Sequence, residues 1–176
     1  MKKLTVTLLA LVMVFALAVA SADDVFSFRN GITFGMTEDE VIAKENVQPH
    51  EIDTERTHGP VTFKEVEYEN LTDDNVRGDV KYLFHDNKLV AIRVGMETRD
   101  ITAEDATLFL TEKIGEKTDY IAERLGNAIY AIDDDGVPEE NTVVFLGKNV
   151  IAVLEVDDDG DEIDITFLDP NADYIK

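Results

Sequence analysis

Alternating apolar and polar residues predict β-strands, most clearly on either side of Asp86-Asn87. In the segments 78–85 and 88–97 every second residue is apolar; these residues are Val80, Tyr82 and Phe84, then Val90, Ile92, Val94 and Met96. A two-residue loop between two such segments is typical of a β-hairpin. The sequence therefore predicts an antiparallel hairpin over 78–97.

Four further segments have the composition of strands: 61–68, 142–146, 150–156 and 162–168. In the first, the apolar phase shifts near Lys64-Glu65, as a β-bulge would require. Residues 150–154 are apolar on both faces, which favours a central strand. We interpret the polar stretch 50–60 as a loop.

Two helix starts are marked by threonine. Thr37 and Glu40 have the spacing of a capping box, and Met36 with Val41 has that of a hydrophobic staple, so a helix should begin here and end before Pro49. A second helix is predicted over 101–115, because Ile101-Thr102-Ala103-Glu104-Asp105 repeats the apolar-Thr-x-x-acid helix start. Its inward residues are Ala106, Phe109, Leu110 and Ile114. A short helix from Thr118 to Gly126 and a short strand over 128–132 complete the prediction.

This order of elements predicts an α+β fold, in which an antiparallel β-sheet has two or three helices packed on one face. A helix followed by a meander of strands occurs twice, in segments 23–99 and 100–176, which have the same length. The sequence is therefore consistent with two tandem helix–meander halves, or with one continuous domain.

The first 22 residues have the pattern of a secretory signal peptide. Lys2 and Lys3 precede an apolar run over 4–19, and Ala20-Ser21-Ala22 resembles a cleavage site. An uncleaved membrane anchor is the alternative interpretation. We expect a protein that is secreted or kept in the periplasm or cell envelope, and that meets the membrane only during export. The chain has no cysteine, which excludes disulfides and a lipid-modified cysteine.

The segment Gly35-Met36-Thr37-Glu38-Asp39-Glu40-Val41 resembles the glycine-Met-Thr-x-x-acid-Val helix start of the SmpA/OmlA family of small envelope proteins. The fold of that family is similar to one half of the β-lactamase-inhibitor protein, which is a tandem repeat of helices followed by a meander. The resemblance implies a non-enzymatic envelope or secreted binding module, and it assigns a function to no individual residue.

Acidic residues dominate the composition. There are 38 Asp and Glu residues against 16 Lys and Arg, for a formal charge of −22 at pH 7. Such a charge excludes nucleic acid as a plausible partner. It leaves cation binding, a basic protein partner, or solubility alone as explanations.

Few residues suggest catalysis. Ser21 and Ser27 are the only serines, and Ser27 lacks the glycines of a nucleophile elbow. His50, Glu51, Asp53 and His58 could gather around zinc on a loop, although a polar loop collects such residues by chance. We expect no enzyme; a carboxylate-dependent hydrolase is kept as an alternative because so many acidic pairs are available.

The acidic turn after residue 156 suggests calcium. If Gly160 takes the sixth position of an EF-hand loop, the twelfth is Thr166 and not the required acid, so an EF-hand is excluded. A weaker calcium site at Asp157, Asp159 and Asp161 remains an alternative to a solvated turn.

The favoured function is a non-catalytic module that binds an unknown protein or cell-wall component. A calcium-binding or calcium-stabilised extracellular module is the first alternative. An exposed aromatic patch would mark the contact surface. The candidates for it are Phe26, Phe28, Phe34 and Phe63.

Overall fold

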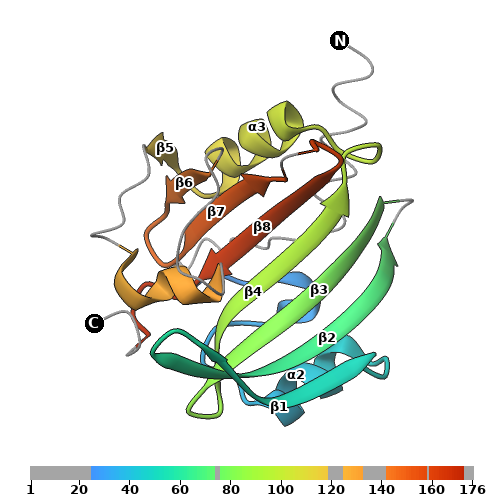
Figure 1. Ribbon diagram of the computed structural model, residues 1–176, viewed down its shortest axis with the longest axis vertical. Coiled ribbons are helices and arrows are strands. Elements are labelled where there is room, and N and C mark those ends of the chain that lie inside the picture. Colours follow the sequence, from blue (N-terminus) through green and yellow to red (C-terminus); the bar gives the residue numbers. More distant parts are fainter. Residues whose placement is uncertain (1–24, 74–75, 119–124, 133–141, 158, 173–176) are drawn as a thin grey trace.

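A computed structural model describes residues 25–73, 76–118, 125–132, 142–157 and 159–172 (Figure 1). The helices are η1 (Arg29–Gly31), α2 (Glu38–Glu45), α3 (Ala103–Lys113) and η2 (Gly126–Ala131). The strands are β1 (Glu51–His58), β2 (Val61–Asp73), β3 (Val76–His85), β4 (Lys88–Glu97), β5 (Glu116–Thr118), β6 (Val143–Leu146), β7 (Ile151–Val156) and β8 (Glu162–Leu168). The predicted signal peptide, and most of the helix predicted from Thr118 to Gly126, lie outside the described residues.

The strands form one antiparallel sheet in the order β1-β2-β3-β4-β8-β7-β6-β5. The strands β1 to β4 follow α2 and form one meander, and β5 to β8 follow α3 and form another. The two meanders join through their last strands, β4 and β8, which lie side by side at the centre of the sheet (Figure 1). Residues 91–97 pair without interruption with residues 168–162. The predicted antiparallel sheet with helices is confirmed.

Apolar side chains are buried on both faces of the sheet. The first cluster joins the N-terminal segment and both α-helices to the sheet, through residues such as Phe28, Val41 and Phe109. The second cluster lies on the opposite face and includes Leu125, Ala128 and Ile132 in and around η2. Because a hydrophobic cluster covers each face of the sheet beside η2, several strands have apolar side chains on both faces.

This double burial explains the phase shift near Lys64-Glu65. Val61 and Phe63 belong to the second cluster, whereas Val66 and Tyr68 belong to the first. The apolar residues therefore change face although β2 itself is continuous there. The predicted bulge in this strand is wrong: the register shift against β1 lies on β1, between Asp53 and Arg56.

Both predicted helix starts are confirmed. The Thr37 side chain accepts a hydrogen bond from the Glu40 amide, and the Glu40 carboxylate accepts one from the Thr37 amide at 2.8 Å, which completes the capping box. Thr102 caps α3 by accepting from the Asp105 amide at 3.2 Å. The left-handed Asn46 ends α2 before Pro49, as expected.

The hairpin around Asp86-Asn87 is also confirmed. Both residues have positive φ, 49° and 60°, as a tight two-residue turn between twisted strands requires. The register shifts next to the turn, where Phe84 pairs with Leu89 while Leu83 pairs with Ala91. This shift places Val90 in the second cluster, whereas Ile92 belongs to the first. The prediction that Val90 and Ile92 face the same side of the sheet is therefore wrong.

Two further predictions of local structure are wrong. The predicted loop over 50–60 contains β1, an edge strand that pairs only with β2. Charged residues are common on edge strands because they discourage pairing with other chains, so the strand resembles a loop in sequence. The predicted strand over 128–132 belongs to the 3-10 helix η2. A short apolar run does not distinguish the two structures. Among the described helices, none has the length and apolar character needed to cross a membrane.

Candidate functional site

Charged side chains occupy the part of the sheet face that extends beyond η2. Glu67, Lys81, Arg93 and Thr166 stand directly opposite one another on β2, β3, β4 and β8. The next row contains Asp79, Gly95, Asp164 and Glu155, on β3, β4, β8 and β7. Directly opposite residues of antiparallel strands point to the same face. These two rows are called the open face below.

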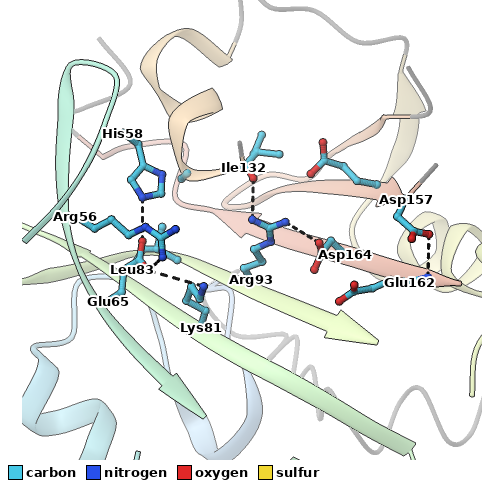
Figure 2. A pocket seen from close by; sticks show the side chains of 12 residues that line it. Arg56, His58, Glu65, Lys81, Leu83, Arg93, Ile132, Asp157, Glu162 and Asp164 are labelled. Atoms are coloured by element: carbon cyan, nitrogen blue, oxygen red, sulfur yellow. Dashed lines mark hydrogen bonds and ion pairs between the residues drawn. The ribbon is translucent and has the colours of Figure 1, made fainter. Parts of the chain in front are cut away.

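A cavity of about 380 Å³ lies over the open face and is bordered by β1 and η2. Figure 2 shows His58, Arg56 and Glu65 on one side and Asp157, Glu162 and Asp164 on the other, with Arg93 between them. A second hollow of about 280 Å³ shares Lys81, Arg93, Glu162 and Asp164 with this cavity and extends to Asp79 and Gly95.

Glu65 is a buried carboxylate surrounded by basic side chains. Its Oε1 lies 3.2 Å from His58 Nε2, and its Oε2 lies 3.4 Å from Arg56 Nη1 and 3.9 Å from Lys81 Nζ. Both Glu65 and His58 are less than a tenth exposed. Because a buried carboxylate needs compensating charge or donors, this arrangement keeps Glu65 in place at the cavity wall.

His58 and Arg93 attach η2 to the sheet. His58 Nδ1 lies 2.9 Å from the carbonyl oxygen of Tyr130, which can only accept, so Nδ1 carries a proton. Arg93 donates from Nη1 to the Ile132 carbonyl at 3.1 Å and from Nη2 to Asp164 Oδ2 at 2.7 Å. The two contacts fix the cavity border, and the Arg93–Asp164 pair also bridges β4 and β8.

Carboxylates gather at the β7–β8 side. Glu155 is buried and accepts a hydrogen bond from Thr142 Oγ1 at 3.1 Å. Glu162 lies at the exposed rim. Desolvation, and then the negative charges of Asp164 and Asp157, raise the pKa of the Glu162 carboxyl. The electrostatic potential at this side is therefore unfavourable for a further negative charge and favourable for a positive one.

Gly95 lines the second hollow, and two carboxylates crowd the position that a side chain would take. A Cβ atom built at this position would lie 3.1 Å from Glu162 Oε1 and 3.2 Å from Asp164 Oδ1. Both carboxylate oxygens therefore converge on the place where any other residue would have a side chain.

Asp157, Asp159 and Asp161, the residues proposed for calcium, lie in the turn between β7 and β8. Backbone amides of this turn already donate hydrogen bonds to the Asp157 side chain. Asp157 Oδ1 accepts from the amides of Asp161 and Glu162 at 2.9 and 3.0 Å, and these bonds lower the pKa of its carboxyl. Asp161 has a raised pKa because it interacts with Asp157. Among the described residues, no three His, Asp or Glu side chains are arranged to hold a metal ion.

The histidines considered for zinc are not brought together. His50 pairs with Glu69 at 3.2 Å, while His58, at the far end of β1, contacts Glu65 and Tyr130. The strand between them separates the two side chains, so the flexible loop on which that alternative depended does not exist.

The prediction of an exposed aromatic patch is wrong. Phe26, Phe28 and Phe63 are buried, with 5%, 1% and 1% of their surface exposed, and Phe34 is half-buried against the first cluster. Phe26 and Phe34 stack with ring centroids 4.9 Å apart, and Phe63 lies in the second cluster. These aromatic rings are core residues because both faces of the sheet have a hydrophobic core.

Sequence reasoning missed the residues of the open face and of the cavity over it. The available signal was a set of charged residues at positions that alternate with core residues in strands, namely Glu65, Lys81, Arg93, Glu155 and Asp164. A charged residue there usually faces solvent. The sequence did not show that these positions from different strands meet beside η2.

No family model, curated protein or solved structure matches this chain.

Proposed function

We propose that this protein is an exported, non-catalytic binding module that holds a protein or a cell-wall component against the open face of its sheet. The observation that carries the proposal is the cavity over that face, since ligand sites are concave and present a few fixed polar groups. Its residues come from the strands of both meanders and from η2, so the site belongs to the body of the fold.

The charged side chains of the cavity hold one another in position. Arg93 is fixed by Asp164 and by the Ile132 carbonyl, and Glu65 is fixed by His58, Arg56 and Lys81. A surface whose side chains are already ordered loses less entropy when a partner binds. This preorganisation favours recognition of a specific partner over general solubility as the role of the face.

The position of the cavity also agrees with a duplicated module. We propose that α2 with β1–β4 and α3 with β5–β8 are two halves of a tandem duplication, similar to the β-lactamase-inhibitor architecture. The halves meet at β4 and β8, and the Arg93–Asp164 pair crosses that junction. On this proposal, neither half alone would have the complete site.

Site-directed photo-crosslinking tests the proposal. A photoreactive phenylalanine analogue would replace Glu67, which lies on the open face, and in a control variant it would replace Glu112, which is exposed on α3. After export from a bacterial host, irradiation should produce a discrete adduct with the variant at position 67 and not with the one at position 112. Equal labelling at both positions, or labelling at position 112 alone, would contradict the proposal.

A further inference from the structure

We infer that the partner presents a basic segment to the open face, and that a lysine or arginine side chain of this segment enters the space above Gly95, between Glu162 and Asp164. This inference rests on the proposed function. It specifies the chemistry of the partner, which the proposal itself leaves open.

The charge balance of the cavity favours a cationic ligand. Five carboxylates line it, against three residues that are always basic: Glu65, Glu155, Asp157, Glu162 and Asp164 against Arg56, Lys81 and Arg93. The basic residues already face carboxylates of the same surface. An incoming anion would have to compete with those carboxylates, whereas an incoming cation would meet negative charge that is in excess.

Glu162 contributes to this excess at the rim of both hollows. Its side chain forms no hydrogen bond or ion pair with the described residues. Desolvation and then the charges of Asp164, Asp157 and Asp79 raise the pKa of its carboxyl, and the charge of Arg93 offsets only part of this rise. An ammonium or guanidinium group placed beside it would relieve this repulsion. The side chain is at the rim, so a partner can reach it without opening the fold.

The hollow of about 280 Å³ that Gly95 lines beside Glu162 and Asp164 has the position that such a group needs. Gly95 lies in the interior of β4 with regular pairing to Asp79 and Asp164, and its φ is not positive, so the backbone conformation does not require glycine. Glycine weakens a strand, and it often marks a place where another molecule approaches closely. The carboxylate oxygens of Glu162 and Asp164 flank this place.

The whole molecule would attract the same kind of partner. Its formal charge of −22 becomes two units more negative if the segment that carries Lys2 and Lys3 is removed. A strong negative potential accelerates encounter with basic proteins and repels acidic ones, and salt weakens the effect. The local and the overall charge therefore select the same partner chemistry.

Peptide binding tests the inference. Fluorescence anisotropy would compare labelled acetyl-pentalysine amide with acetyl-pentaglutamate amide. The lysine peptide should bind and the glutamate peptide should not. Glu162→Gln should weaken lysine-peptide binding by roughly 5- to 10-fold, which is typical of a local charge contact. Glu112→Gln removes the same charge from an exposed position on α3, and it should change binding by less than about 2-fold.

Gly95→Val tests the space without removing a charge. It should abolish lysine-peptide binding. The thermal unfolding midpoint should fall only slightly, because the Cβ meets the carboxylate ends of Glu162 and Asp164 at 3.1 and 3.2 Å and these side chains can shift, while valine itself favours strands. Gly95→Ala, with a smaller side chain, serves if the valine variant is unstable, and should also weaken binding. Equal effects of Glu162→Gln and Glu112→Gln, or full binding by folded Gly95→Val, would overturn the inference. If no basic peptide binds while the position-67 crosslink persists, the inference fails and the proposed function survives.

Discussion

At the scale of single residues, buried polar side chains differ in whether they have partners. Glu45 is almost fully buried and accepts hydrogen bonds from Asn30 and from the Tyr82 hydroxyl, and Arg29 lies 3.4 Å away. The hydroxyl of Tyr68 is also buried but has no hydrogen-bond partner among the described residues. Burial, with the negative charge of Glu45 as a second cause, raises the pKa of Tyr82 well above its ordinary value and that of Tyr68 to about 12.

These two tyrosines predict loss of stability in alkali. An unfolded tyrosine ionises near pH 10, whereas folded Tyr68 keeps its proton to about pH 12. The stabilising contribution is complete below pH 10 and is lost between pH 10 and 12, because only the unfolded state releases its proton there. In urea unfolding, the free energy of unfolding of Tyr68→Phe at pH 7 should equal or exceed that of the wild type. Between pH 9 and 11 this free energy should fall less in the variant than in the wild type. A loss as large as that of the wild type would contradict this assignment.

At the scale of elements, the turn between β7 and β8 depends on Asp157 as an acceptor for two backbone amides. Asp157→Ala removes the acceptor and should lower the thermal unfolding midpoint by roughly 2–4 °C, the effect expected for a lost turn hydrogen bond in a protein of this size. Asp157→Asn keeps an oxygen that can accept, and should have at most half that effect. If both variants behave alike in calorimetry, the negative charge matters more than the hydrogen bonds.

The sequence predicted those elements whose signal is local. The Thr37 cap, the Thr102 cap and the Asp86-Asn87 turn are each determined by a few adjacent residues, and all three are confirmed. The edge strand β1 and the helix η2 were missed because each depends on what packs against it. The same limit applies to the open face: alternation can place Arg93 and Asp164 on strand faces, but only the β4–β8 pairing brings them together.

At the scale of the whole molecule, 38 acidic residues repel one another, and ions should stabilise the fold in proportion to how well they screen that repulsion. Self-repulsion of this kind is distributed over the surface and does not need a coordination site. It therefore makes a different prediction from the calcium alternative at Asp157, Asp159 and Asp161, because specific binding raises the unfolding midpoint by mass action for one ion only.

Thermal unfolding of residues 23–176, the chain without the predicted signal peptide, separates the two explanations. The protein would be measured in chelator, then in millimolar calcium, and then in magnesium at matched ionic strength. We expect similar, small rises with both ions, since Asp157 is already engaged by its own turn and no described cluster is arranged to hold a metal. A rise with calcium alone, abolished in Asp157→Asn/Asp159→Asn, would contradict this expectation. It would mean that the β7–β8 turn rearranges around the ion, and because Asp157 also borders the cavity, calcium would then reduce the negative charge on which binding of a basic partner depends.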